Sequence, residues 1–200
     1  MLLTSPCAAC GGLAPAGVAV CGRCTAELSP PPSLSVPLGL DACSTLLGYD
    51  DVERSLITAL KNRQRRDLVG WLAAGLAAEV SEPAVGVVVT WAPTSPERRR
   101  RRGFDQAELL ARALARRWGR PCRPLLRREP GPPQAGRSRI ERRAHPGFAA
   151  LRPVPRRVLL VDDVATTGAT LTAAARALRR AGAAEVTAVV AARASGRSGH

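Results

Sequence analysis

The stretch Val158 to Thr170, VLLVDDVATTGAT, decides the fold that we expect for this chain. Four apolar residues, Val158–Val161, open it, and such a short apolar run is typical of a strand covered on both faces, as in parallel sheets. The acids Asp162 and Asp163 follow, and the turn from there to Gly168 is rich in small and hydroxyl side chains. The stretch therefore predicts a strand, a polar turn and the start of a helix.

The segments on either side repeat this alternation of strand and helix. Downstream, a helix is predicted over Ala169–Arg180, where Gly182 ends it, and a strand over Glu185–Ala191. Upstream, Val85–Thr90 (VGVVVT) is another short apolar run. Strands that alternate with helices favour an α/β fold with a doubly wound, mostly parallel sheet, whose ligands bind at the carboxyl ends of the strands.

Between these strands, the sequence predicts a loop over Trp91–Gly103 and then a helix in the segment DQAELLARALARRWG. Asp105 is placed to cap that helix, with Glu108 three residues later, and Gly119 ends it. The unit is thus a strand, a loop and a helix.

The remaining segments are helical or rich in proline. Asp51–Val80 has apolar residues near helical spacing, and the basic group Lys61–Arg66 interrupts it, so we expect two helices or one broken helix. Pro121–Pro155 has little periodicity apart from a short helix predicted around Ser138–Ala144. The stretch Ser29–Gly39 (SPPPSLSVPLG) cannot sustain a helix or an internal strand, and it is the natural linker.

Each part of VLLVDDVATTGAT has a chemical use. Backbone N–H groups at a helix N-terminus bind a phosphate group, and Gly168 allows the chain to approach that phosphate closely. The carboxylates of Asp162 and Asp163 can accept hydrogen bonds from the two hydroxyls of a ribose, or orient a magnesium ion bound to them. A strand followed by an acid-capped helix is the alternative, and it explains neither the acid pair nor the turn. Hydroxyl donors for the phosphate are available on Thr166, Thr167 and Thr170.

Four cysteines near the N-terminus form two CxxC pairs, which predict a closed tetrahedral site for a structural zinc ion. The alternatives are a redox pair or disulfides. A module this small has little core, so the binding free energy of the metal becomes folding free energy. The pairs are Cys7 with Cys10 and Cys21 with Cys24.

The other cysteines and both histidines are isolated in the sequence. Cys43 and Cys122 are expected to be small apolar filler residues, and His145 and His200 to be ordinary solvated side chains.

Charge and composition limit the function classes. The 200-residue chain has 30 Lys plus Arg against 16 Asp plus Glu, and its net charge of +14 suits phosphate-bearing ligands or nucleic acid. Because Lys61 is the only lysine, the charge is almost entirely arginine, which also fits the codon usage of a GC-rich genome. The N-terminus lacks a signal-peptide pattern, and no apolar run approaches the roughly 18 residues of a membrane span, so we expect a cytoplasmic protein without membrane insertion.

The run from Val158 to Thr170 resembles, over its full length, the signature of type I phosphoribosyltransferases that binds phosphoribosyl pyrophosphate (PRPP). The resemblance implies that PRPP, bound with magnesium, loses pyrophosphate as an acceptor nitrogen attacks its anomeric carbon, and that Asp162 and Asp163 are the catalytic residues. The loop Trp91–Ser95 lies where this family keeps its pyrophosphate loop, and Arg98–Arg102 beyond it either holds pyrophosphate or forms a solvated basic loop. The residues implied to bind PRPP are Val164, Ala165, Thr166, Thr167, Gly168, Ala169, Thr170, Thr94, Ser95 and Arg102.

The chain as a whole resembles the ComF family over nearly its full length. This chain has Asp105 where that family usually has Asn, and its stretch Arg137–Phe148 is short, with His145 and Pro146 in place of an Asn and an aliphatic residue. The shared features are the paired CxxC motifs, Lys61, the segment Arg102-Gly-Phe-Asp-Gln106, Gln134, Glu141-Arg-Arg143 and the PRPP signature.

Two functions follow from this resemblance. The first is a phosphoribosyltransferase with an unidentified acceptor. The second is an accessory protein of DNA uptake in natural competence, which binds single-stranded DNA through its arginines and zinc ribbon and keeps PRPP as a ligand or relic. Aromatic residues make up only 3% of the chain, which leaves few side chains to stack bases. The expected domains are a zinc ribbon over 1–30, a Pro-rich linker over 31–44 and a phosphoribosyltransferase-like domain over 45–200.

Overall fold

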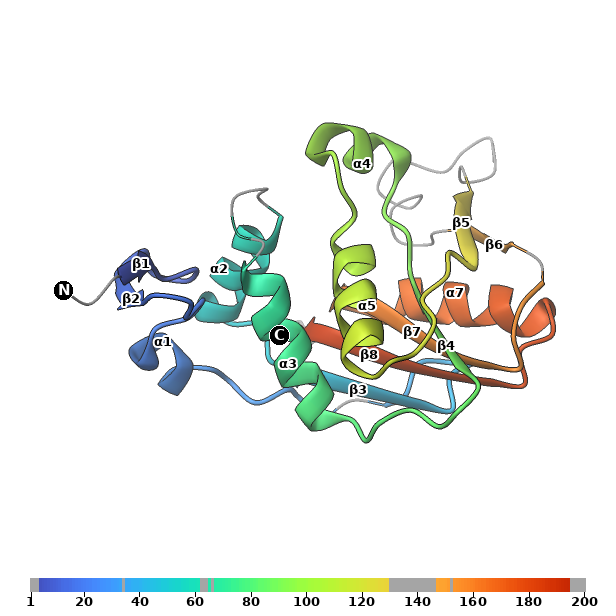
Figure 1. The fold of residues 1–200 in the computed structure, drawn as a ribbon. Helices are drawn as coiled ribbons and strands as arrows, with labels where there is room; N and C mark the ends of the chain where they lie inside the picture. Colours follow the sequence, from blue (N-terminus) through green and yellow to red (C-terminus); the bar gives the residue numbers. More distant parts are fainter. Residues whose placement is uncertain are drawn as a thin grey trace, which may run out of the picture.

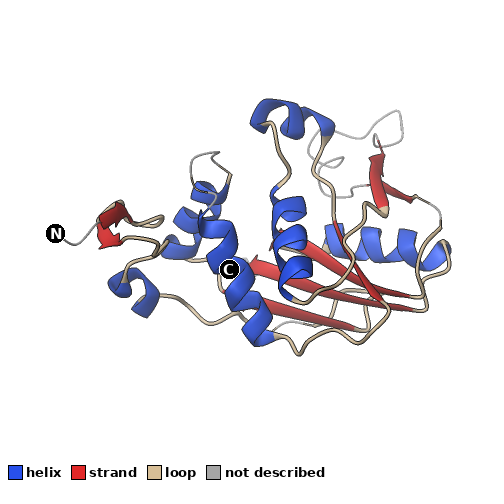
Figure 2. Cartoon of the chain, in the orientation of Figure 1, coloured by secondary structure: helices blue, strands red, loops and turns tan. Residues whose placement is uncertain are grey.

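The structure is a computed structural model that describes residues 4–33, 35–61, 65, 67–129, 147–151 and 153–194. Figure 1 and Figure 2 show a small N-terminal module beside a central sheet that carries helices on both faces. None of the helices in these residues is long and apolar enough to cross a membrane. The strands are β1 Thr4–Pro6, β2 Leu13–Pro15, β3 Ala42–Leu47, β4 Val87–Trp91, β5 Leu126–Glu129, β6 Gly147–Ala150, β7 Arg157–Ala165 and β8 Glu185–Arg193. The helices are α1 Gly22–Ala26, α2 Asp51–Leu60, α3 Asp67–Glu79, α4 Pro96–Arg102, α5 Gln106–Arg117 and α7 Ala169–Arg180.

Four parallel strands in the order β3, β8, β7, β4 form the central sheet. Val161 of β7 pairs with Val189 of β8 on one side and with Trp91 of β4 on the other. Successive side chains of a strand point to opposite faces, so Leu160 packs on the α7 side of the sheet and Val161 on the α5 side. Helices cover both faces, which confirms the predicted doubly wound α/β fold.

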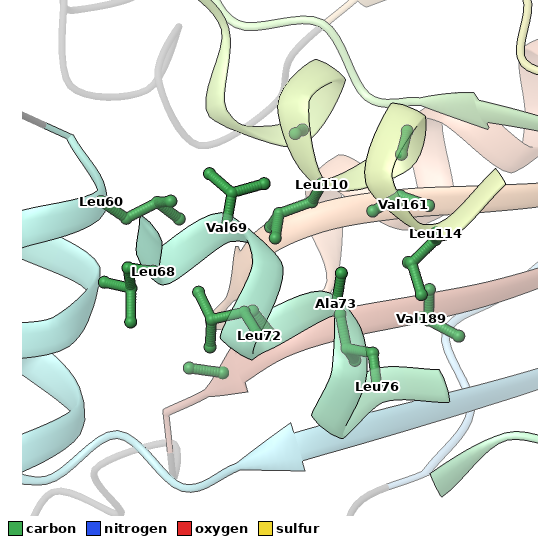
Figure 3. Close-up of a cluster of buried hydrophobic side chains, with 14 of the residues drawn as sticks. Leu60, Leu68, Val69, Leu72, Ala73, Leu76, Leu110, Leu114, Val161 and Val189 are labelled. Carbon is green, nitrogen blue, oxygen red and sulfur yellow. The ribbon is translucent and has the colours of Figure 1, made fainter. Parts of the chain in front are cut away.

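Helices α3 and α5 cover one face of the sheet, α2 packs against α3, and buried leucines of these helices belong to one cluster with Val161 and Val189 of the sheet (Figure 3). Each fully buried leucine stabilises the fold by about 1.5–3 kcal/mol relative to an exposed one. This layer holds the two stretches predicted to be helical around the basic group at 61–66, now seen as two separate helices. The leucines on α3 and α5 that are completely buried are Leu68, Leu72, Leu76, Leu110 and Leu114.

Helix α7 and the antiparallel β5–β6 hairpin cover the other face of the sheet. Leu126 and Phe148 of the hairpin belong to the same buried cluster as Leu171 and Leu178 of α7. The hairpin is therefore fixed to the sheet through α7, beside the carboxyl end of β7.

The segment predicted as a loop over Trp91–Gly103 contains helix α4, so that prediction was wrong for its second half. Pro96 is the first residue of the helix, the Ser95 hydroxyl accepts a hydrogen bond from the Arg98 N–H (3.3 Å), and Gly103 ends the helix with φ of 78°. The helix buries none of its residues, so it lacks the apolar periodicity from which helices are predicted.

Strand β7 continues further than the predicted Val158–Val161. It runs to Ala165, which pairs with Arg193 of β8, so the acids Asp162 and Asp163 lie within the strand and not in the turn. The helix predicted around 138–144 lies outside the described residues.

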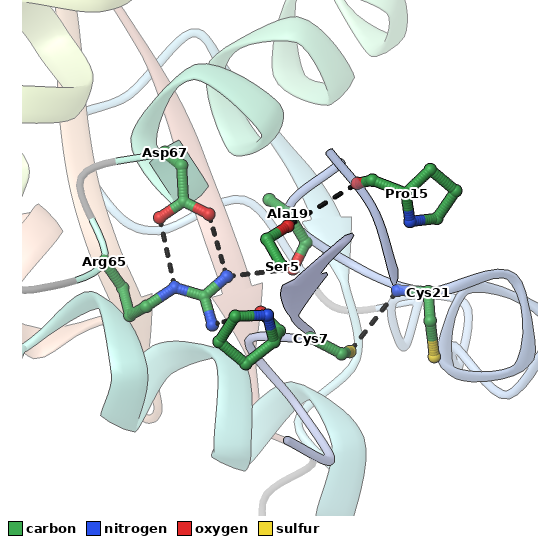
Figure 4. A network of polar contacts seen from close by, with 8 residues as sticks. Ser5, Cys7, Pro15, Ala19, Cys21, Arg65 and Asp67 are labelled. Carbon is green, nitrogen blue, oxygen red and sulfur yellow. Dashed lines mark hydrogen bonds and ion pairs between the residues drawn. The ribbon is translucent and has the colours of Figure 1, made fainter. Parts of the chain in front are cut away.

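Arg65 fixes the N-terminal module against the rest of the chain (Figure 4). Its guanidinium donates hydrogen bonds to the carbonyl oxygens of Pro6 (2.8 Å) and Ala19 (3.2 Å). The same group forms an ion pair with Asp67 at the start of α3 (2.8 Å). One largely buried side chain therefore joins the cysteine-bearing segment to the helical layer.

Candidate functional site

A cleft of about 1010 Å³ opens at the carboxyl ends of β4 and β7. Its walls come from the loop between β4 and α4, from α4 itself, from the end of α2 and from the β5–β6 hairpin. This is the edge of a parallel sheet at which ligands of doubly wound folds bind. A smaller hollow of about 350 Å³ adjoins the cleft at the turn between β7 and α7.

The acid pair lies where the cleft meets this hollow. Asp162 is 6% exposed and lines both spaces, and Asp163 is half-buried and lines the cleft. The Asp162 carboxylate accepts a hydrogen bond from the Asp163 N–H (2.9 Å), and the Asp163 carboxylate accepts one from the Val164 N–H (2.9 Å). Burial, and after it the charge of Asp163, raises the pKa of Asp162 well above its usual value. Hydroxyl donors or a cation in the cleft would stabilise the ionised pair.

The turn after β7 forms the smaller hollow. The first N–H groups of α7 have no partner within the helix and face the end where an anion is favoured. Gly168 adopts φ of 74°, which an L side chain rarely takes, and a Cβ there would lie 3.2 Å from Cγ of Pro37. The glycine thus lets the turn reverse and lets the linker pack against it. The predicted residues that line this hollow are Val164, Ala165, Thr166, Thr167, Gly168, Ala169 and Thr170.

The opposite side of the same cleft is lined by the predicted residues Thr94, Ser95 and Arg102. Arg102 donates a hydrogen bond to the Gln106 side-chain oxygen (3.1 Å). Burial lowers the pKa of Arg102, and the nearby charge of Asp163 raises it. The structure therefore brings the predicted acid pair, phosphate turn and pyrophosphate loop to one place.

Two cationic residues line the cleft that were not predicted as part of the site, Lys61 at the end of α2 and Arg128 on β5. Lys61 was noted only as a shared feature of a family. Arg128 lies in the four-residue strand LRRE, where two adjacent arginines and one leucine give no usable alternation. The sequence held no signal that separates Arg128 from the other arginines.

The four predicted zinc ligands form one cluster in the N-terminal module. Their Sγ atoms all lie within 4.8 Å of one another, and the Cys10 and Cys21 Sγ atoms are 3.9 Å apart. A tetrahedral zinc ion with Zn–S bonds of about 2.3 Å requires sulfurs about 3.8 Å apart, whereas a disulfide requires about 2.05 Å. The cluster is compatible with zinc, and its cysteines are free thiols.

Backbone N–H groups point at the sulfurs of this cluster. The Cys7 sulfur accepts a hydrogen bond from the Cys21 N–H (3.3 Å), and the Cys10 sulfur accepts one from the Gly12 N–H (3.4 Å). Burial raises the pKa of the Cys7 thiol, but hydrogen bonds from backbone N–H groups outweigh burial and lower this pKa to about 6. Such N–H donors favour the thiolate, which is the form that binds a metal.

Comparisons with known proteins concern part of the chain. Residues 134–199, about a third of the chain, match the family model of the phosphoribosyl transferase domain, and the match spans β6, β7, α7 and β8. Among solved structures, the crystal structure of TT1426 from Thermus thermophilus is 22% identical over 70% of this chain and 86% of that chain, with a TM-score of 0.35. Among curated proteins, none is significantly similar to this chain in sequence.

The family match supports a domain of the phosphoribosyltransferase type around the acid pair and the phosphate turn. Neither comparison is to a protein described as ComF, so that narrower resemblance stays a prediction.

Proposed function

We propose that this protein is a phosphoribosyltransferase, which binds PRPP with magnesium, transfers its phosphoribosyl group to an acceptor and releases pyrophosphate. One observation carries the proposal. Asp162 and Asp163 lie at the carboxyl end of a central parallel strand, between the turn that opens α7 and the loop that follows β4, in one cleft. The family match over 134–199 supports the same reaction class.

The hollow at the start of α7 fits the 5′-phosphate of PRPP. Its N–H groups and the hydroxyls of Thr166, Thr167 and Thr170 are donors of the kind that phosphate oxygens accept. The adjoining carboxylates of Asp162 and Asp163 accept hydrogen bonds from the two ribose hydroxyls, which orients the anomeric carbon toward the larger cleft.

The loop on the opposite side fits the pyrophosphate group. As the bond between the anomeric carbon and pyrophosphate breaks, the leaving group takes the electron pair and gains negative charge, while the acceptor nitrogen forms the new bond to carbon. Thr94, Ser95 and the Arg102 guanidinium lie where they can donate hydrogen bonds to that charge. Magnesium supplies further positive charge when it is bound with PRPP. The protein contributes positioning and charge, and no covalent nucleophile is needed.

Release of pyrophosphate from PRPP tests this proposal. Zinc-loaded protein with magnesium and PRPP would be screened against single nitrogen nucleophiles, and pyrophosphate would be measured. We expect pyrophosphate release that depends on one added acceptor. The double variant Asp162→Asn and Asp163→Asn should not release pyrophosphate. Failure of the wild-type protein to bind PRPP at all would refute the proposal.

The N-terminal cysteine cluster has a structural role in this proposal. We propose that residues 1–30 form a zinc ribbon, that 45–200 form the phosphoribosyltransferase-like part, and that 31–44 connect them, with the last three residues of this connection already in strand β3. The contacts of Arg65 with Pro6, Ala19 and Asp67 support a ribbon that is packed against the catalytic part.

A second candidate function is favoured by helix α4. Arg98 to Arg101 are all exposed on this helix, and a run of exposed arginines attracts the phosphates of a single nucleic acid strand. Binding of single-stranded DNA in competence is therefore the alternative, with PRPP as a ligand. The salt dependence of DNA binding separates the two functions.

A further inference from the structure

Arg128 is held at the edge of the cleft by two contacts. It lies on β5, and its guanidinium carbon is 5.4 Å from the centroid of the Phe148 ring on the paired strand β6. Its side chain also donates a hydrogen bond to the carbonyl oxygen of Pro93 in the β4–α4 loop (3.3 Å). A guanidinium has five N–H donors, and this is the one hydrogen bond of the Arg128 side chain to another described residue, while the residue itself lines the cleft.

The charge of Arg128 has no ion-pair partner among the described residues. None of the ion pairs found in that part of the chain involves Arg128. Burial lowers its pKa first and the positive charge of Arg98 lowers it further, while the negative charges of Asp162 and Asp105 raise it. A half-buried cation with unused donors is stabilised by an anion that binds it, and bidentate pairing with a carboxylate or phosphate suits the shape of a guanidinium.

No tryptophan, tyrosine or phenylalanine side chain lines the part of the cleft that the structure describes. The whole sequence contains six residues of Trp, Tyr and Phe, all six are described by the structure, and none of them lines the cleft. The one nearby ring, Phe148, is 4% exposed and lies under Arg128. Recognition of the acceptor by the described lining of this cleft therefore depends on charge and hydrogen bonds.

The other walls of the cleft are already used by the two ends of PRPP. The turn at Thr166 to Thr170 faces the 5′-phosphate, and the Thr94 and Ser95 loop faces pyrophosphate. The other cations of the described lining are Lys61 at the end of α2, Arg98, Arg100 and Arg101 on α4, and Arg128 on the hairpin. Among these described side chains, Arg128 is the one that a hydrogen bond and a cation–π contact hold in place. We infer that the acceptor carries a carboxylate or phosphate group and that Arg128 binds this group. The inference rests on the proposed function, because it names the class of acceptor for that same reaction.

Pairs of probes that differ in charge test this inference in the full-length, zinc-loaded protein. Ribose 5-phosphate and magnesium pyrophosphate would fill the PRPP site without allowing turnover. Binding would then be measured by calorimetry for nicotinate against nicotinamide, anthranilate against aniline, and phosphoethanolamine against ethanolamine. The first two pairs test a carboxylate, and the third tests a phosphate.

Three variants make the result specific to Arg128. Arg128→Met removes the charge, and Arg128→Lys keeps the charge but loses the planar fork. Arg123→Met removes an exposed arginine just before the hairpin that does not line the cleft, and it is the matched control. The affinity of each variant for pyrophosphate shows whether its cleft is intact.

We expect the wild-type protein to bind the anionic member of at least one pair about tenfold or more tightly than the neutral member. Arg128→Met should reduce this preference to about twofold or less while its affinity for pyrophosphate is unchanged. Arg128→Lys should keep part of the preference for the anionic member, and Arg123→Met should keep all of it.

Equal binding of both members by the wild type, or a preference that survives in Arg128→Met, overturns the inference. Loss of pyrophosphate affinity alone in Arg128→Met would assign Arg128 to the leaving group and also overturn it. If wild-type protein binds PRPP but shows no charge preference, the inference fails and the proposed function stands; if PRPP does not bind, the proposed function itself fails.

Discussion

The carboxylate of Asp105 connects the start of α5 to the loop that follows β4, because one of its oxygens accepts a hydrogen bond from the Thr94 N–H at 2.8 Å. The other oxygen accepts hydrogen bonds from the N–H groups of Ala107 (3.1 Å) and Glu108 (3.4 Å) and so caps the helix. Asp105 is 2% exposed. The position of the proposed pyrophosphate loop is thereby coupled to a buried helix cap.

Replacement of Asp105 should separate these two roles. Asp105→Ala removes the cap and the loop contact, and should lower the free energy of unfolding by about 1–2 kcal/mol. Asp105→Asn keeps an oxygen for the helix N–H groups, but its amide NH₂ cannot accept from Thr94. Chemical unfolding and PRPP titration would compare both variants. We expect Asp105→Asn to lose more free energy of PRPP binding than free energy of unfolding. Equal PRPP affinity in Asp105→Asn and wild type would show that the Thr94 contact does not position the loop.

The pH dependence of stability follows from the same group. Burial raises the pKa of Asp105 above its usual value, so the folded state binds this proton more tightly than the unfolded state does. The stability that Asp105 contributes is therefore fully present below the unfolded pKa of about 3.9, and it is lost as the pH rises through the folded pKa. The free energy of unfolding of wild type relative to Asp105→Asn should fall as the pH is raised from about 4. The exposed Asp51, changed to Asn and measured over the same pH series, is the control for effects that do not involve Asp105.

The strands and helices that the sequence predicted are those with a buried apolar face. Val158–Val161 lies in the sheet centre, covered on both faces, and its composition alone indicates this. Strand β3 was missed because it is an edge strand whose residues are mostly half-buried, and its sequence ACSTLL has no apolar run. Helix α4 was missed because it is fully polar, although Ser95, Pro96 and Gly103 carry ordinary helix signals.

The cysteine cluster predicts about one zinc ion per purified chain. Elemental analysis should find it in wild-type protein prepared without chelator, and Cys10→Ser or Cys21→Ser should lose it because a thiolate ligand is removed. The central sheet should remain folded by circular dichroism, since its strands and α7 have their own buried core. Cys43→Ser is the control, because it removes a cysteine outside the cluster, and this variant should keep its full zinc content. Wild-type protein without zinc, or with a disulfide among the four cysteines, would contradict the prediction.

PRPP with magnesium should raise the thermal midpoint of unfolding. A ligand that binds only the folded state at about 100 times its Kd adds about 2.7 kcal/mol of stability. Asp163→Asn removes a charged acceptor from the cleft, and we expect about ten- to a hundredfold weaker PRPP binding, which corresponds to about 1.5–3 kcal/mol. Asp51→Asn, an exposed acid outside the cleft, should bind PRPP like wild type. If PRPP raises the thermal midpoint of Asp163→Asn as much as that of wild type, Asp163 does not contribute to PRPP binding.

The local chemistry of the candidate site could be predicted from the sequence, whereas its surroundings could not. Asp162, Asp163 and the turn to Thr170 are contiguous, so their roles follow from one short segment. Arg128 and Phe148 are distant in the sequence, and only the pairing of β5 with β6 brings them together. The contact of Pro37 with Gly168 likewise depends on the path of the linker, which a proline-rich composition does not fix.

Helix α4 allows the two candidate functions to be separated in one variant. Arg98, Arg100 and Arg101 line the cleft, whereas Arg99 forms an ion pair with Glu108 (3.5 Å). Changing the three cleft-lining arginines to Gln keeps good helix formers and removes three charges. The matched control is the triple change of Arg116, Arg117 and Arg180 to Gln, all exposed and outside the cleft.

We expect the α4 variant to weaken the binding of PRPP and pyrophosphate and to leave the salt dependence of single-stranded DNA binding unchanged. The reason is that these arginines share one cleft with Asp162 and Asp163. If α4 instead binds DNA, each neutralised phosphate contributes about 0.7 to the slope of log K against log salt, so three lost arginines flatten this slope by about two. PRPP binding would then change little. Titration of both ligands against wild type, the α4 variant and the control variant decides between these outcomes, and an α4 variant that behaves like the control for both ligands would mean that the helix serves neither function.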